Sequence, residues 1–322
     1  MKSQDEIVAA RSADWRELEG ILLRAGSFGE LDGPTISRAA ALYRALSTDL
    51  ILCRARATPD LVAYLDSLAS RAHSALYGAE PFRAPALLTL LTRDFPVVFR
   101  QNILFFVAAS ALFLIPCAIG VLLALFVPHA ASEILPRSTL DHMAEMYSGD
   151  LDAGRSEGVD ASMAGFYVYN NVGIAFRCFA TGILFGIGSV FFLIYNGLHI
   201  GLVAGWVTAS GFGRNIGTFM CGHGPFELTA IVIAGAAGLR MGHSLIVTRG
   251  RTRIGSLRQA APDLVRLIAG AAVMLLIAAG VEGFWSPSAA PAPVKWAVSV
   301  VFSLLVAAYL AFAGRHGSRR TA

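Results

Sequence analysis

The residues best suited to chemistry in this sequence are ionisable side chains surrounded by apolar ones. His223 and Glu227 are spaced so that they share one face of a helix. Arg177 is a third charged residue in an apolar stretch, and both Arg177 and Glu227 are expected near the outer ends of their segments. Charges inside a membrane usually pair or face a cavity. Two interpretations stay open: Arg177 pairs with Glu227, or it reaches the lipid headgroups alone.

A metal site at His223 and Glu227 would need further ligands that converge on the same point. Cys221 and His199 could supply them, but His199 is expected near the inner end of its segment, far from His223. The HExxH helix of membrane metalloproteases is absent from the sequence. We therefore predict no metal and a structural, capping role for His223 and Glu227. The alternative is that Glu227 and Arg177 take part in moving protons or ions.

No other pattern predicts catalysis. The sequence has no Walker A motif, no GxSxG, and no GxGxxG between a strand and a helix. We expect no enzyme activity and no cofactor. The four cysteines lack CxxC spacing and lie in different segments, which indicates free structural thiols. They are Cys53, Cys117, Cys178 and Cys221.

His223 and Glu227 belong to the stretch GHGPFELTAIVIAGAAGLRMG, residues 222–242. Pro225 suits the first turn of a helix, where its missing N–H has no partner to lose. Glu227 then lies where the helix dipole favours a negative charge. Small residues at 234, 238 and 242 share the face of Glu227 and would let another helix approach closely. The opposite face carries Arg240 and His243, which could reach the headgroups at the far end.

The composition predicts a membrane protein. The chain has 322 residues, 55% hydrophobic and 15% charged, with a mean hydropathy of +0.60. This is too apolar for an ordinary soluble protein, and the apolar runs after residue 102 are long enough to span a bilayer. The net charge of +4 comes from arginines beside these runs, so we expect membrane lipid as a partner and no nucleic acid. Residues 1–30 lack the apolar core of a signal peptide.

The predicted fold is all-α: a polytopic membrane helix bundle with an N-terminal soluble helical domain. Residues 1–102 form that cytoplasmic domain, with helices from about 3 to 24, 35 to 57 and 59 to 76. The domain ends in an amphipathic stretch, 86–102, expected on the membrane surface. Residues 103–314 form the bundle, and residues 315–322 form a basic cytoplasmic tail.

Six membrane segments are predicted, with both termini on the cytoplasmic side. The loop 128–171 holds seven acids against two bases and is expected outside, whereas the arginines at 249–258 are expected inside, as the positive-inside rule requires. The alternative is a third segment that is re-entrant. The segments are 103–127, 172–195, 198–210, 226–247, 264–284 and 296–313.

Glycines four positions apart recur in the second, third and fourth segments. This spacing is typical of helices in close contact. It predicts that these segments form the compact centre of the bundle. The glycines are Gly182 and Gly186, then Gly197, Gly201 and Gly205, then Gly238 and Gly242.

Several stretches resemble the stage II sporulation protein M family of bacterial integral membrane proteins. They include RDFPVVFR, NNVGIAFRCFATGILFGIGS, LIYNGLHIGLVAG and, above all, HGPFELTAIVIAGAAGLRMG, and together they cover most of residues 10–245. The N-terminal extension of roughly 100 residues is of the kind seen in longer relatives. The family motif and structural candidates are Asn170, Asn171, Arg177, His223, Gly224, Pro225, Glu227, Gly235 and Gly238.

The resemblance implies a scaffold or anchor with no catalytic activity of its own. The family's namesake works in engulfment with two peptidoglycan-remodelling partners, the stage II sporulation proteins D and P. By resemblance we expect envelope proteins to bind the acidic outer loop. We also expect a cytoplasmic partner for residues 1–102. The rival class is a transporter or permease-like component that moves an ion or small solute through a site near Glu227 and Arg177.

Overall fold

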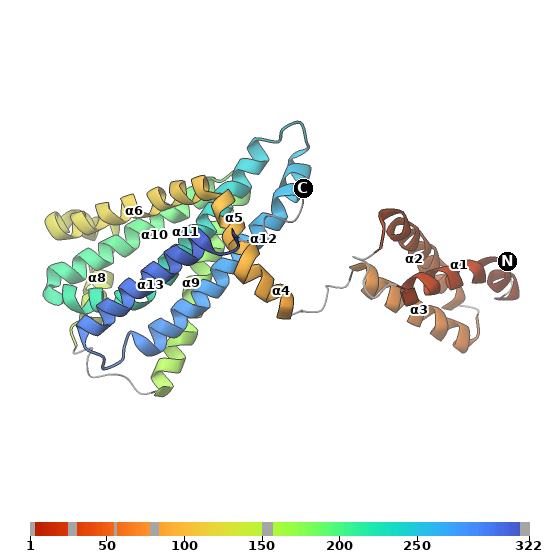
Figure 1. The fold of residues 1–322 in the computed structure, drawn as a ribbon, viewed down its shortest axis with the longest axis horizontal. Helices are drawn as coiled ribbons and strands as arrows, with labels where there is room; N and C mark the ends of the chain where they lie inside the picture. Colours follow the sequence, from red (N-terminus) through yellow and green to blue (C-terminus); the bar gives the residue numbers. More distant parts are fainter. Residues whose placement is uncertain (1–3, 25–30, 55–56, 78–83, 150–156, 316–322) are drawn as a thin grey trace. The chain divides into compact units, whose positions relative to one another are not determined.

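The computed structural model describes residues 4–24, 31–54, 57–77, 84–149 and 157–315. Within these ranges the regular structure is helical throughout, which confirms the all-α prediction. The chain divides into two compact units, Met1–Arg83 and Ala84–Ala322 (Figure 1).

The N-terminal unit is a three-helix bundle. Its helices are α1 (Gln4–Arg24), α2 (Gly33–Arg54) and α3 (Pro59–Tyr77), close to the predicted boundaries. Pro59 opens α3, where its fixed φ is compatible with the first turn. The apolar faces of the three helices meet in one core, formed by Trp15, Leu18, Ile21, Ala39, Leu42, Leu46, Leu50, Cys53, Leu65, Leu68 and Ala72.

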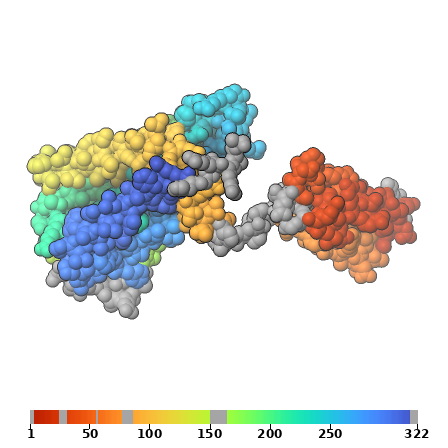
Figure 2. All heavy atoms as spheres, viewed as in Figure 1, coloured from red at the N-terminus to blue at the C-terminus, as the bar shows by residue number. Residues whose placement is uncertain are grey.

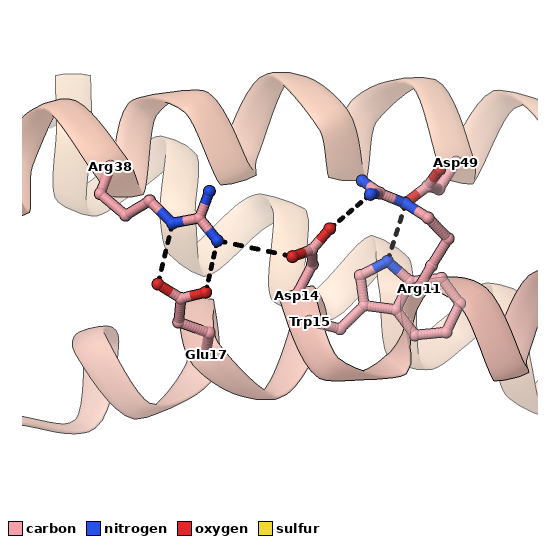
Figure 3. A network of polar contacts seen from close by, with 6 residues as sticks. All are labelled: Arg11, Asp14, Trp15, Glu17, Arg38 and Asp49. Atoms are coloured by element: carbon pink, nitrogen blue, oxygen red, sulfur yellow. Dashed lines mark hydrogen bonds and ion pairs between the residues drawn. The ribbon is translucent and has the colours of Figure 1, made fainter.

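A polar network joins α1 to α2 beside this core (Figure 3). The buried Asp49 carboxylate accepts hydrogen bonds from Trp15 Nε1 and Arg11 Nε, each at 2.9 Å. Arg38 donates two hydrogen bonds to the Glu17 carboxylate, from Nε at 2.9 Å and from Nη2 at 2.6 Å. Because a buried carboxylate must be paired, Asp49 fixes the register between the two helices.

Residues 84–101 belong to the membrane unit, whereas the sequence analysis placed them in the N-terminal domain. They form α4 (Ala84–Thr89), a π-helical turn η2 (Leu90–Asp94) and α5 (Phe95–Gln101). Phe95 is buried, and its ring packs so closely on Gly270 that a Cβ there would lie 2.2 Å from a ring carbon. Arg100 donates to the carbonyls of Leu310 and Ala313, both at 2.8 Å. The last carbonyls of α13 (Ala292–Phe312) have no N–H partner within the helix, and Arg100 supplies hydrogen-bond donors to two of them.

Helices α6 (Ile103–Phe126) and α10 (Ile187–Val207) lie side by side and run parallel. The glycines of α10 form the contact and confirm the predicted close packing. Cβ atoms on them would lie less than 3 Å from α6 backbone atoms, Gly197 at Phe113, Gly201 at Cys117 and Gly205 at Val121. Two short helices, α7 (Pro128–Ile134) and α8 (Arg137–Met146), follow α6.

The predicted second and third segments are wrong in their boundaries. In place of the predicted segment 172–195, the structure has the helix α9 (Glu157–Ala180), which begins inside the predicted loop 128–171. A short 3₁₀ turn, η4 (Thr181–Ile183), then leads into a chain reversal before α10. Phe185 and Gly186 have positive φ angles of 54° and 87°, which end the helix there. Gly186, predicted as a packing glycine, is therefore also the residue that permits the turn.

The predicted start of the helix that carries Glu227 is also wrong. After α10, a π-helical turn η5 (Thr208–Phe212) leads into α11 (Gly213–Ile246). Gly211, with φ of 95°, bends the chain so that α10 and α11 are antiparallel. Pro225 lies inside α11 rather than in its first turn. A proline is tolerated within a membrane helix because neighbouring groups satisfy the freed carbonyl.

Helix α11 is the centre of the bundle. It contacts α6, α9, α10, α12 (Arg253–Gly280) and α13 (Ala292–Phe312), and all its residues from Ala230 to Gly238 are buried. A π-helical turn, η6 (Val281–Trp285), extends α12. Glycines allow this close packing. Gly182 of η4 and Gly238 of α11 have no side chains, so the two backbones are in direct contact.

Four stretches are long and apolar enough to cross a membrane: Ile103–Phe126, Ile187–Ile246, Arg253–Trp285 and Ala292–Phe312. The second of them contains both α10 and α11. The count of six crossings stays a prediction. Helices α6 and α13 both form part of the outer surface in Figure 2 and expose large apolar side chains, among them Leu104 and Leu304. Such surfaces are typical of helices that face lipid.

Candidate functional site

Three ionisable side chains meet inside the membrane unit: His223 and Glu227 on α11, and Glu282 on η6. His223 Nε2 lies 3.5 Å from a Glu227 carboxylate oxygen and 4.0 Å from a Glu282 carboxylate oxygen. The side chains are 5%, 13% and 9% exposed, in that order. We call these three residues the triad.

Neighbouring polar groups hold the triad in place. Ser286 Oγ lies 3.1 Å from His223 Nδ1, which fixes the imidazole ring with Nε2 toward the carboxylates. Asn171 Nδ2 donates to the other Glu282 oxygen at 3.4 Å. Asn170 Nδ2 in turn donates to the side-chain oxygen Oδ1 of Asn171 at 3.0 Å. The predicted Asn170–Asn171 pair therefore belongs to the site, with Asn171 buried and Asn170 exposed.

A buried lysine lies on the far side of the serine. Lys295 of α13 is 1% exposed, and its ammonium donates to the Ser286 carbonyl at 3.0 Å. Helices α9, α11 and α13 and the turn η6 thus all contribute to one polar network in an apolar bundle. Ionisable residues within membrane bundles are rare, so this network is a candidate functional site.

The glycines that flank His223 have separate roles. A Cβ on Gly222 would lie 3.1 Å from Ser286 Oγ and 3.2 Å from a Trp285 ring carbon, so this glycine lets η6 approach His223. A Cβ on Gly224 would meet no atom within 4 Å. The π-helical turn adds one residue to the helix at Glu282, a distortion that is frequent at functional sites. Local backbone geometry therefore directs both elements toward the triad.

The triad lies in the wall of a cavity of about 220 Å³. Asn170, Asn171 and His199 line the same cavity. The prediction that His199 lies far from His223 is wrong, because the chain reverses earlier than expected and α10 carries His199 back alongside α11 to the same cavity. The Nδ1 atom of His199 is buried and has no hydrogen-bond partner among the described residues.

Arg177 does not reach Glu227. It is exposed on α9, and the ion-pair partner of Glu227 among the described residues is His223. Arg177 lies roughly 9 Å further along α9 than Asn171, at a rise of about 1.5 Å per residue. The expected common depth of Arg177 and Glu227 was wrong because α9 begins inside the predicted loop.

The remaining candidates from the sequence are packing positions. A Cβ on Gly235 would lie 2.5 Å from the Leu193 side chain, and one on Gly238 would lie 2.2 Å from Ser189 Oγ. Ser189 donates to the Cys178 carbonyl at 2.6 Å, which closes the contact between α9 and α10. These glycines place α11 against its neighbours and do not touch the triad.

A second cavity, of about 400 Å³, lies at the other end of α11. Arg240, His243, Arg249 and Arg251 are among the residues that line it. Arg240 and His243 both lie against the Phe105 ring, the guanidinium carbon at 5.8 Å and the imidazole at 5.4 Å. The two cavities share no lining residue.

Sequence reasoning missed Glu282. The signal was present, because Glu282 is an acid between apolar residues in a segment predicted to cross the membrane. An ionisable residue in such a segment is by default a functional candidate. What the sequence could not give was its proximity to His223, which requires the contact between α11 and η6.

Comparison with known protein families supports this assignment of elements. The profile of the family described as stage II sporulation protein M matches residues 103–287, more than half of the chain. A second profile, described as a domain of unknown function (DUF8413), matches residues 5–78, which are the N-terminal unit. No curated protein and no solved structure gives a significant match. The chain therefore belongs to the stage II sporulation protein M family.

Proposed function

We propose that this membrane protein works as a non-catalytic scaffold or anchor for a complex that builds or remodels the cell envelope. It would act in the bacterial inner membrane with both termini in the cytoplasm. The family and the apolar helices support the membrane role. The positive-inside pattern of the arginines supports the orientation.

One observation carries the scaffold proposal: the centre of the bundle is closed by backbone contacts. Gly182 meets Gly238, and Gly242 meets Gly186, at distances that leave no room for a side chain. Along α11, the Gly182–Gly238 contact lies between the cavity at the triad and the cavity at Arg240. A solute would have to separate packed helices to pass, whereas an anchor needs the rigidity that such packing gives.

Two surfaces outside the bundle core could bind partners. On α7 and α8, Glu133 and Arg137 are 72% and 77% exposed. On the N-terminal unit, the apolar side chains of Ile51 and Leu52 are 70% and 57% exposed. Exposed apolar residues beside polar ones are typical of protein-binding surfaces. The first surface suits an envelope protein, and the second suits a cytoplasmic one.

Site-specific photo-crosslinking in native membranes tests the proposal. A crosslinking amino acid replaces Glu133, Ile51 or, as a lipid-facing control, Leu304. We expect discrete protein adducts from Glu133 and Ile51 and none from Leu304. Envelope or peptidoglycan-remodelling proteins among the adducts of Glu133 would support the scaffold. Loss of all discrete adducts at both positions, at normal expression, would contradict it.

The second candidate function is transport of a proton or small ion. The observation that favours it is the polar cavity that reaches Glu227 within the bundle. Arg177 is not part of this hypothesis, because it is exposed on α9 and Glu227 pairs with His223 instead. Purified protein in vesicles loaded with a pH-sensitive dye distinguishes the two functions. A proton flux that Glu227→Gln abolishes would favour transport, and no flux above that of empty vesicles would exclude proton movement.

A further inference from the structure

We propose that His223, Glu227 and Glu282 bind a divalent transition-metal ion such as Zn²⁺. This proposal departs from the expectation of no metal and does not depend on the scaffold proposal. It starts from the spacing of the three ligand atoms. One nitrogen or oxygen from each residue lies within 4.8 Å of the other two.

The distances favour a bridging ion over direct hydrogen bonds. His223 Nε2 is 3.5 Å from Glu227 and 4.0 Å from Glu282, longer than a hydrogen bond to a carboxylate, which is about 2.7–2.9 Å. Ligands about 2.0–2.2 Å from a tetrahedral zinc are themselves separated by about 3.3–3.6 Å. The triad is close to that spacing, so small side-chain rotations would complete the coordination.

The electrostatics point the same way. Two carboxylates face one imidazole nitrogen in a site that is largely shielded from solvent. A divalent cation bound between the two carboxylates would remove the repulsion between them, which burial makes large.

The surroundings resemble those of a metal ligand set. Metal-binding histidines almost always use the second ring nitrogen in a hydrogen bond, as His223 Nδ1 does with Ser286. Glu282 is likewise held by Asn171. The cavity beside the triad offers room for water or another ligand at the open coordination position. His199 in the same cavity has a buried nitrogen without a described partner.

The ligand types select the class of metal. One imidazole nitrogen and two carboxylates suit Zn²⁺, Mn²⁺ or Fe²⁺, whereas Ca²⁺ and Mg²⁺ prefer sites built from oxygen alone. We choose Zn²⁺ and Co²⁺ as probes, because Co²⁺ takes similar sites and reports its coordination by visible absorption. The full-length protein in nanodiscs is first treated with a chelator.

Titration with Co²⁺ should give one equivalent bound per chain, with the absorption of a low-coordinate site that Zn²⁺ abolishes. Glu227→Gln and Glu282→Gln should each weaken binding at least about tenfold, since even an outer-shell loss costs 10–100-fold. The matched control is Glu133→Gln. Its partner His129 is also four residues away and 3.5 Å distant, but that pair is exposed and has no third ligand within the described part of the chain. Binding in Glu133→Gln should equal that of the wild type.

X-ray absorption of the zinc-loaded wild type keeps the test decisive if a variant fails to fold. We expect one imidazole and otherwise oxygen ligands. Zn²⁺ should also raise the unfolding midpoint of the wild type but not of a folded Glu282→Gln protein. Absence of stoichiometric binding, a sulfur ligand, or equal binding by wild type and both triad variants would overturn the proposal.

Discussion

At the scale of single residues, buried charge decides where this chain is sensitive to change. Glu282 and Asp49 are both buried acids, one in each compact unit. Asp49 lies where α1 meets α2 and accepts hydrogen bonds from Arg11 and Trp15. Glu282 lies beside His223 and is held by Asn171. Each is tied to residues far away in the sequence, so each joins elements that periodicity alone would leave unrelated.

We predict that Asp49→Ala destabilises the N-terminal unit by about 2–3 kcal/mol, because it leaves the buried Trp15 N–H and the Arg11 guanidinium without their acceptor. The control is Asp66→Ala. Asp66 pairs with Arg54 at 2.7 Å, but both side chains are more than half exposed, so the expected loss is about 0–1 kcal/mol. Urea unfolding followed by tryptophan fluorescence measures both. Equal losses would contradict the role given to Asp49.

The thiol of Cys53 should react slowly. Its side chain is 1% exposed, and burial, with the nearby Asp49 charge as a smaller cause, raises the thiol pKa. The folded protein therefore holds the thiol proton more tightly than the unfolded chain. The stability that this provides is complete below the ordinary thiol pKa of about 8.5 and is lost as the pH rises above it.

A variant that retains Cys53 alone tests this prediction. Alkylation at pH 8 should be much slower in the native protein than in urea, because each unit of raised pKa lowers the thiolate fraction about tenfold. The midpoint of unfolding should fall between pH 8 and pH 10. A native rate equal to the rate in urea would show that Cys53 is accessible and the core wrongly assigned.

At the scale of elements, glycines determine how closely the helices approach. The contact of α11 with α9 and α10 depends on Gly238, whose missing side chain leaves space for Ser189 Oγ and the Cys178 carbonyl. The same residue type has a second use at Gly186 and Gly211, where positive φ angles of 87° and 95° turn the chain. The spacing of glycines in the sequence predicts close helix packing. It does not predict the turns, because a glycine permits a positive φ angle but does not require one.

We predict that Gly238→Ala destabilises the bundle by about 1–3 kcal/mol, because the new methyl group would lie 2.2 Å from Ser189 Oγ and 2.6 Å from a backbone oxygen. Gly280→Ala is the matched control. Gly280 is also helical, and a Cβ there would meet no atom within 4 Å, so this change should be neutral or slightly stabilising. Thermal unfolding in detergent compares the two. A stable Gly238→Ala protein would mean that α11 can move away from its neighbours at little cost.

At the scale of the whole molecule, the chain is two units, each with its own hydrophobic core. Among the described residues, the buried core positions of the N-terminal unit all come from α1, α2 and α3. The core of the membrane unit surrounds α11 and contains none of these residues. Two separate family profiles, for residues 5–78 and 103–287, match the two units.

Residues 1–83 should therefore fold in isolation. We expect a monomeric, helical protein in water that unfolds cooperatively with urea, because its buried apolar surface needs no contribution from the bundle. A chain of this size is near the lower limit for a stable core, so Leu46→Ala, in the middle of α2, should unfold it. Circular dichroism gives both results. A non-cooperative transition in the wild-type fragment would mean that the unit depends on the membrane part.

The sequence by itself determined what depends on local pattern and composition. The three N-terminal helices, α6, α13, the membrane class and the close glycine contacts all follow from periodicity, apolar length and residue size. Pro59 marked the start of α3 correctly because a first-turn proline is a local effect. Resemblance to the family was also correct, since the motif around His223 is contiguous in the chain.

Only the tertiary structure decided the chain reversal at Gly186, the early start of α11 and the membership of the site. Apolar residues continue through the reversal, so hydropathy shows one segment where the structure has two helices. Because these boundaries were predicted wrongly, Arg177 and His199 were assigned to the wrong depth. The proximity of Glu282 to His223 was not predicted. These positions depend on which helices pack together, and packing is a long-range property that no window along the chain contains.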